Sequence, residues 1–571
     1  MQKFIKYSIY LLSPILLSLF IIIYVSENTD LIENTYKKQI IQEIQDSTDL
    51  KVNIDNMNIT WIGLKPSIQL NNIIIKNKDD VDLIKGKKLI VTINLIQSIV
   101  NNQITPIELN LVSSDIRLEY SKESIYFKNY NLISLQKDFN NDSSKYNFSN
   151  LKFRVTSSNI SLINAPILGD YKLNNINLVL FNEKSTLKVF STFNQEMSNQ
   201  VIHFAADLIF DKNNKPSGTF YSKGLGVDIK QFNIMNNIQV SLNNTNYVLW
   251  AYLNNGTINN INGKLDIKKV NFSDKKNKFE YDDISTNLLY KASKRNSDFV
   301  LNNLDFKSNN KAYQDNKFLF KSKGKEYSAF LRDLEVPDLN NILEISLPFV
   351  AKTYINKLES MYSGSLANIK LFNLLDKRKL EYSLDFENVS IINDSQDSIS
   401  NISGNIAGNL KNGDIALTSN DISFKFHTGK QLILDTINGN IKYISQKNTI
   451  YISTSSLNID DLHQIKLKGY LKPKLTNIRL VGIGDLKSIS RLINDNNLLD
   501  STRYNIGLSG KYKIDYRFYK KDNKENIYGA LDLTNLIIKN PSNKLIISGL
   551  NTRINFSNKY LISSKNDYYL N

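Results

Sequence analysis

The side chains that could carry acid–base or metal chemistry are few in this chain of 571 residues. The histidines are His203, His427 and His463. They are isolated from one another, and none belongs to a group with metal-ligand spacing. Adjacent carboxylates occur at Asp79-Asp80 and Asp460-Asp461, but neighbouring residues of a strand point to opposite faces, so neither pair can act together. The sequence therefore predicts no catalytic site, no metal site and no cofactor.

Motifs of the common enzyme classes are also absent from the sequence. It has no H-E-x-x-H zinc motif, no phosphate-binding glycine loop and no G-x-S-x-G nucleophile turn. It has no cysteine, which excludes disulfides and thiolate chemistry. The net charge of +16 comes from lysines spread along the chain, so we expect no nucleic-acid partner. A general attraction to anionic lipid surfaces remains as the functional interpretation of this charge.

Apolar side chains recur along the sequence with a period of two residues. In Leu380–Phe386, for example, apolar residues alternate with Glu381, Ser383 and Asp385. Such alternation puts the apolar set on one face of a strand and the polar set on the other. The positions predicted to line an apolar groove are Trp61, Ile68, Leu70, Leu384, Phe386, Phe424, Phe426, Ile452 and Leu467.

Strands must position these side chains, and they recur along almost the whole chain. Ile68-Leu70 and Ile73-Ile75 are predicted to mark successive strands, and turns such as Asn254-Asn255-Gly256 separate others. A glycine recurs inside several alternating runs, where it predicts a bulge or bend. Amphipathic helices are too few to cover the sheet. The predicted fold is therefore mainly all-β: a long, curled and twisted antiparallel sheet that forms an elongated apolar groove, with a few short helices.

The N-terminal residues predict a membrane anchor. The run Tyr7–Val25 has no charge and can just span a bilayer as a helix. Lysines precede the run and acidic residues follow it, which places the N-terminus in the cytoplasm and the body outside. A cleaved signal peptide is the alternative, but Val25-Ser26-Glu27 is a poor cleavage site. The predicted anchor residues include Ile9, Leu12, Leu16, Phe20 and Ile23.

These patterns divide the chain into consecutive segments. The predicted segments are a cytoplasmic tip and transmembrane signal anchor at 1–25, an amphipathic helix at 26–48, the N-terminal part of the β-groove at 49–335, an interrupting helix at 336–362, and a continuing β-groove at 363–571 that is incomplete at its end.

The segment Asp49 to Ile75 resembles the opening of AsmA-like envelope proteins, in particular the long YhdP type. The family order W-x-G-L-x-P-x-L-x-L is represented by Trp61, Gly63, Leu64, Pro66, Ile68 and Leu70. Val336 to Ile369 is similar to a helix that interrupts the family's sheet, and Gly529 to Pro541 to a strand pair beyond it. The chain stops at Asn571, short of the usual length of these relatives, so a C-terminal part is expected to be missing.

The resemblance implies a single-pass protein of the inner membrane with its body in the periplasm. It implies that the body carries phospholipid between inner and outer membranes, with an outer-membrane or periplasmic protein as a further partner. The alternative is an anchored β-solenoid scaffold, or an outer-membrane assembly or regulatory factor, whose apolar face is a solid core. An enzyme is disfavoured by the missing motifs, and a transmembrane barrel by the irregular strand lengths.

Overall fold

The computed structural model contains two compact units, residues 1–292 and 293–571, and each is treated by itself below. The predicted anchor at 1–25 lies outside the described residues, and so does most of the predicted helix at 26–48, of which Lys37, Ile41 and Gln42 are described and helical. No helix within the described ranges is long and apolar enough to span a membrane. The structure describes residues 37, 41–42, 51–62, 65–76, 82–100, 105–121, 124–127, 130–131, 151–165, 169–183, 186–195, 200–211, 215–235, 238–273, 278–293, 295–308, 311–338, 361–373, 379–392, 396–426, 429–460, 462–489, 507–521, 524–540, 545–558 and 561–570.

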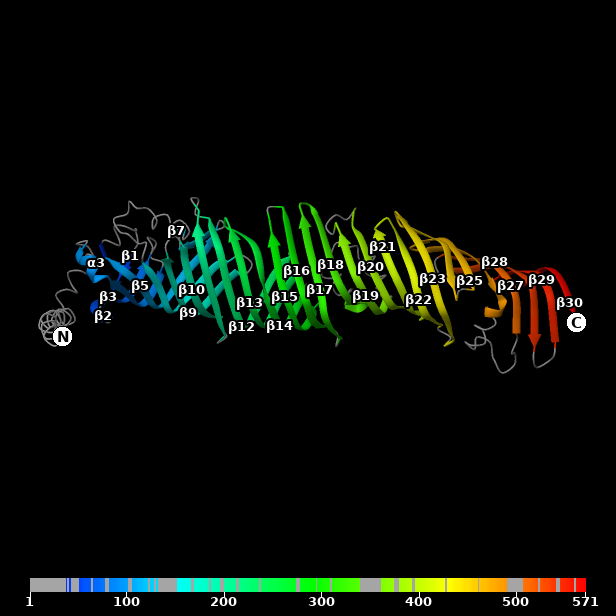
Figure 1. Cartoon of the computed structure of the whole chain (residues 1–571), viewed down its shortest axis with the longest axis horizontal. Coiled ribbons are helices and arrows are strands. Elements are labelled where there is room, and N and C mark those ends of the chain that lie inside the picture. Colours follow the sequence, from blue (N-terminus) through cyan, green and yellow to red (C-terminus); the bar gives the residue numbers. More distant parts are fainter. Residues whose placement is uncertain are drawn as a thin grey trace, which may run out of the picture. The chain divides into compact units, whose positions relative to one another are not determined.

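Unit 1 is a curled sheet whose strands mostly pair with their neighbours in the chain (Figure 1). Its elements are β1 (Lys51–Asn53), β2 (Asn56–Ile62), β3 (Lys65–Lys76), β4 (Asp82–Ile93), α3 (Leu95–Val100), β5 (Pro106–Ser121), β6 (Ser124–Phe127), β7 (Tyr130–Asn131), β8 (Lys152–Ala165), β9 (Gly169–Glu183), β10 (Thr186–Gln195), β11 (Val201–Phe210), β12 (Pro216–Met235), β13 (Ile238–Asn254), β14 (Thr257–Ser273) and β15 (Lys278–Ala292).

One strand pair of unit 1 departs from the predicted antiparallel sheet. β5 and β8 run parallel, from the pair Glu108↔Lys152 to the pair Glu119↔Ile163. After β5 the chain forms the short strands β6 and β7 before it returns as β8. A parallel pair requires such a long connection, because a tight hairpin can join only antiparallel strands. The sheet is therefore mixed rather than purely antiparallel.

Unit 2 is a curled sheet in which all the described neighbouring strands pair antiparallel. Residues 336–338 and 486–489 are helical. Of the predicted interrupting helix at 336–362, residues 339–360 lie outside the described part of the chain, and Met361 belongs to β19 rather than to a helix. The strands are β16 (Asn296–Ser308), β17 (Lys311–Lys323), β18 (Glu326–Glu335), β19 (Met361–Phe372), β20 (Glu381–Ile392), β21 (Ser398–Asn409), β22 (Asn412–Lys425), β23 (Gln431–Gln446), β24 (Thr449–Ile459), β25 (His463–Lys472), β26 (Leu475–Asp485), β27 (Gly507–Lys521), β28 (Lys524–Asn540), β29 (Leu545–Ser557) and β30 (Leu561–Leu570).

Many strands contain one residue with a positive φ, and the alternation of side chains shifts there. In β20 this residue is Asn388, with φ 52°, and in β3 it is Asn72, with φ 48°. Asparagine adopts this left-handed conformation more readily than branched residues do. Phe386 and Val389, on either side of Asn388, pack into the same cluster although they are three residues apart. Both arms of the bent strand therefore keep their apolar side chains on one face, which we call the inner face.

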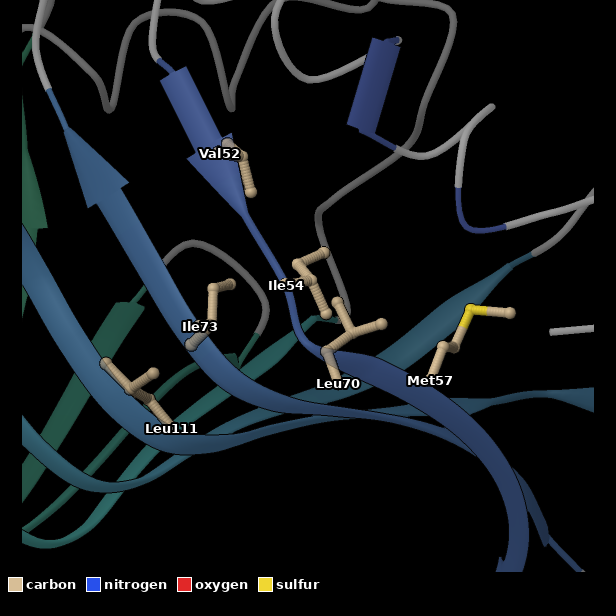
Figure 2. Packing of buried hydrophobic residues seen from close by; sticks show 6 residues of the cluster. All are labelled: Val52, Ile54, Met57, Leu70, Ile73 and Leu111. Carbon is tan, nitrogen blue, oxygen red and sulfur yellow. The ribbon is translucent and has the colours of Figure 1, made fainter. Parts of the chain in front are cut away.

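The structure contradicts the prediction that Ile68-Leu70 and Ile73-Ile75 belong to successive strands. Both pairs lie in the single strand β3, with Asn72 between them. Leu70 and Ile73 project from the same side of this strand into one cluster (Figure 2). A two-residue alternation that is interrupted at Asn, Asp or Ser thus marks a bent strand here rather than a turn.

Side chains of neighbouring strands supply acceptors for the amides at the bends. The backbone N–H of Asn388 donates to Ser403 Oγ of β21 at 3.0 Å. The backbone N–H of Asn244, at the bend of β13, donates to Asp228 Oδ1 of β12 at 2.7 Å. A bend interrupts regular strand pairing, and here a side-chain oxygen of the neighbouring strand takes the place of the backbone acceptor. These polar side chains therefore stabilise the curvature.

We expect Asn388→Val to destabilise unit 2 by about 1–2 kcal/mol, because a branched residue is strained at positive φ. Asn388→Gly should be nearly neutral, since glycine adopts this conformation freely. Urea unfolding of the two variants and the parent protein measures the difference. Equal stabilities of the valine and glycine variants would show that the bend does not depend on a left-handed residue.

The most deeply buried side chains follow the bends. Ile73, Val389 and Ile422 are 1%, 4% and 1% exposed, and each comes directly after a positive-φ residue. In unit 1 the cluster at the first bends consists of Val52, Ile54, Met57, Leu70, Ile73 and Leu111 (Figure 2). In unit 2 a comparable cluster consists of Leu334, Val336, Leu366, Ile369 and Val389. The closed core of each unit thus lies along its bends, and much of the inner face lies outside these clusters.

Candidate functional site

The inner face of unit 1 carries an unbroken row of apolar residues in which each residue is the direct cross-strand partner of the next. Because directly paired residues point to the same side of a sheet, the whole row from β2 to β15 shares one face. Ala206 is 4% exposed, and the other members are half-buried. We call this set inner row 1: Ile59, Ile68, Val91, Leu109, Phe153, Leu180, Val189, Ala206, Phe220, Ala251, Ile261 and Tyr290.

Unit 2 carries a corresponding row from β16 to β28. Its members are apolar, aromatic or glycine, and all are half-buried. We call this set inner row 2: Phe299, Phe320, Ala329, Leu371, Tyr382, Gly408, Gly413, Tyr443, Ile452, Gly469, Ile478, Phe518 and Ile527. Neither row contains a charged residue. Each unit therefore presents a long apolar strip that retains accessible surface.

Several predicted groove positions share this inner face of unit 2: Leu384, Phe386, Ile452 and Leu467. Ile452 belongs to inner row 2, and the other three lie an even number of residues from a member of the row on their own strands. Phe424 pairs with Ile399 and Leu432 on the other arm of β22 and is half-buried. Phe426 follows the end of β22 and is 39% exposed.

The predicted groove positions of unit 1 differ in their exposure. Ile68 belongs to inner row 1, and Trp61, opposite Pro66, lies two residues from Ile59 on the same face. Both Ile68 and Trp61 are half-buried. Leu70 is only 2% exposed and packs inside the cluster at the first bends. The side chain of Leu70 therefore belongs to the closed core in this structure, while Ile68 keeps accessible surface.

Glycines on the inner face make room for large neighbours, a feature that the sequence showed only as recurrent glycines. Gly404 lies opposite Phe386 on one side and Leu417 on the other. At Gly413, an added Cβ would lie 2.5 Å from Tyr443 Oη. The Tyr443 hydroxyl donates to the Asn409 carbonyl at 2.9 Å. These glycines therefore allow aromatic rings to cover the backbone of neighbouring strands.

The outer face carries ion pairs and, contrary to a strictly polar expectation, some exposed aromatic residues. Arg154 Nε lies 3.0 Å from Glu108 Oε1, and Arg479 makes two hydrogen bonds to the Asp515 carboxylate at 2.9 and 2.6 Å. The Asp515 pKa is held below its usual value chiefly by this hydrogen-bonded guanidinium. The outer face also exposes large aromatic side chains, namely Phe190, Trp250, Tyr252, Phe372 and Tyr528.

Reactive groups are not gathered on either face of the described residues. Over these residues, no group of three or more His, Asp or Glu could hold a metal ion. His203 is exposed, and His427 lies outside the described part of the chain. His463 is 4% exposed and sits between the Tyr512 hydroxyl, 2.8 Å from Nδ1, and the Ser488 hydroxyl, 2.6 Å from Nε2. It connects β25 with β27 and with the helical residues 486–489.

Burial lowers the pKa of His463, and the carboxylates of Asp460 and Asp485 only partly oppose this effect. The unfolded state therefore binds more protons than the folded state near the ordinary histidine pKa of about 6.5, so stability falls as pH drops through that value. We expect the thermal midpoint of unit 2 to decrease on acidification. His463→Gln should reduce this decrease, since glutamine does not titrate. Identical pH profiles of the parent and His463→Gln proteins would contradict this role.

The curled sheet with an apolar inner face agrees with the fold that the resemblance to AsmA-like proteins implies. The family model described as YhdP protein matches residues 1–494. Because this match covers most of the sequence, the chain belongs to the YhdP family. No curated protein and no solved structure matches the chain.

Proposed function

We propose that this protein transfers phospholipid between the inner and outer membranes along its apolar inner face. The observation that carries the proposal is the pair of uncharged inner rows, each formed by consecutive cross-strand partners. Membership of the YhdP family supports it. A lipid would rest its acyl chains on the inner rows and leave its headgroup in water. This mode of binding requires no catalytic group and no closely fitted polar pocket.

The energetic reason for such a face is the cost of exposing acyl chains. A diacyl lipid has roughly 30 methylene groups, and each costs about 0.8 kcal/mol when it leaves an apolar environment for water. The total of about 25 kcal/mol makes transfer through water very slow. An apolar strip lowers this barrier because it replaces water at the chains. It only equilibrates lipid, so any direction must come from the lipid supply or from a partner.

The proposed location is the inner membrane, with a single N-terminal span and the body in the periplasm. The uncharged run Tyr7–Val25 and the lysines before it support this placement. The proposed partners are phospholipid, the inner membrane and a protein of the outer membrane or periplasm. No cofactor and no catalytic activity are part of the proposal.

The test is whether the body carries phospholipid after it leaves the membrane. A protease site inserted after Asn28 allows the body to be released from the predicted anchor without detergent. Mass spectrometry of the released protein should detect bound phospholipid, and the protein should accelerate transfer between donor and acceptor vesicles. A released, folded body with neither bound lipid nor transfer activity would refute the proposed function.

A scaffold or assembly factor with a solid core is the second candidate. The closed clusters along the bends favour it locally, because residues such as Leu70 and Val389 leave no surface for a ligand. The half-buried inner rows favour the first candidate. The two functions predict opposite results in the release experiment, since a solid scaffold would carry no lipid.

A further inference from the structure

The short helix α3 exposes apolar side chains to an unusual degree. Ile96 and Val100 are 76% and 77% exposed, and Leu95 is 37% exposed. Ile96 and Val100 are four residues apart, so they lie on the same face of the helix. The helix begins after Asn94, whose side-chain oxygen accepts the Gln97 backbone N–H at 3.2 Å. Apolar side chains gathered on an exposed face of a helix are typical of a surface that binds a protein or a membrane.

The sequence around α3 is free of charge. From Leu89 to Ile107 there is no Asp, Glu, Lys or Arg, although charged residues make up 22% of the chain. Charged side chains resist insertion into a bilayer, whereas apolar and amide side chains can enter its interfacial region. The composition thus fits a lipid surface better than a protein partner that would use ion pairs.

The segment that connects the predicted anchor to Lys37 is short, and it limits the distance between the anchor and this part of unit 1. Lys37 donates a hydrogen bond to the Asp55 carbonyl, and Ile41 packs against the cluster at the first bends. Even fully extended, the chain from Val25 to Lys37 spans at most about 40 Å. Figure 1 places α3 at the same end of unit 1 as β1 and β3. A bilayer that holds the anchor is therefore within reach of α3.

We infer that α3 inserts its exposed apolar face into the interfacial region of the membrane that holds the anchor. This inference rests on the proposed function, because it assumes an anchored protein. Insertion would bring the first members of inner row 1 toward the lipid surface, since α3 follows Val91 by four residues and precedes Leu109. Lipids would then enter the inner face beside α3.

The absence of cysteine from the chain allows a direct test with single labels. Ile96→Cys carries an environment-sensitive dye in the full chain, reconstituted into vesicles of phosphatidylethanolamine and phosphatidylglycerol. Thr257→Cys, at the exposed first residue of β14 in the same unit, is the matched control. Nitroxide-labelled lipid should quench the dye at residue 96 at least about twofold, because interfacial helices enter about 5–10 Å into the bilayer. The dye at residue 257 should keep its fluorescence.

The double variant Ile96→Asp with Val100→Asp tests whether the insertion of α3 is needed for lipid uptake. Both side chains are exposed, so the thermal midpoint should stay unchanged while lipid uptake from vesicles slows several-fold. Equal quenching at residues 96 and 257, or no quenching at 96, would overturn the inference. If bound phospholipid is still found in that case, the proposed function survives. Quenching at 96 in a protein that never binds lipid would support the insertion and reject lipid transfer.

Discussion

Replacing Phe386 with aspartate is expected to abolish phospholipid transfer and to reduce the amount of phospholipid that co-purifies with the released body. Phe386 lies on the inner face of unit 2, between Leu366 and Gly404 on the neighbouring strands. A carboxylate at this position would place a charge among apolar side chains without a partner, and burying it under acyl chains costs several kcal/mol. A single barrier is sufficient to interrupt a path along which lipids move in series.

Phe372→Asp is the matched control for this substitution. Phe372 lies on the adjacent strand β19 and is 47% exposed, but it is paired with Glu381 and so faces the outer side. The same chemical change should there leave lipid content and transfer intact. Since Phe386 also packs against the cluster of Leu366 and Val389, the thermal midpoint must be measured with the lipid content.

Ile452→Asp and Phe426→Asp extend the test along unit 2. Ile452 is half-buried in inner row 2, and Phe426 is 39% exposed. Each variant should impair transfer, and combining Phe386→Asp with Ile452→Asp should add little, because one interruption already stops a series path. Stable variants that keep normal transfer and normal lipid content would refute transfer along the inner face. Additive losses of stability with unchanged lipid content would instead indicate a solid core.

The strand content of the fold could be predicted from sequence because the two-residue alternation is local. Leu384 and Phe386 alternate with polar neighbours, and the structure places them on one face of β20. The bends could not be predicted in the same way. The two-residue alternation of apolar side chains shifts at Asn72, and in the sequence this shift resembles a turn between two strands. The pairing of β3 with β4 on both sides of the bend shows that β3 is one continuous strand.

The candidate site was predicted as separate positions but not as continuous rows. A row depends on the register between strands, and register is set by hydrogen bonding between segments distant in sequence. The parallel pair β5–β8, which joins Leu109 to Phe153 in inner row 1, illustrates this dependence. Gly404 makes room for the large ring of Phe386, but this relation can be recognised only when the two residues are known to lie opposite each other.

The second large effect is expected at Leu70, where arginine should prevent stable folding of unit 1. Leu70 is 2% exposed and packs with Met57, Ile73 and Leu111. Truncation of such a leucine to alanine typically costs 2–5 kcal/mol. Arginine adds an unpaired charge and excess volume to the same space, so its cost should exceed about 3 kcal/mol. Membrane fractions should therefore contain little full-length Leu70→Arg protein, and the remainder should be sensitive to protease.

Ile68→Arg separates this packing effect from an effect on lipid entry. Ile68 belongs to inner row 1, two residues from Leu70 on β3, but it is half-buried and leaves room for a long side chain to reach water. We expect Ile68→Arg to accumulate in the membrane and to bind less lipid, and a photo-crosslinker at residue 68 to capture phospholipid. If Leu70→Arg instead folds normally and only loses lipid, Leu70 lines an open path, and the cluster at the first bends opens during transport.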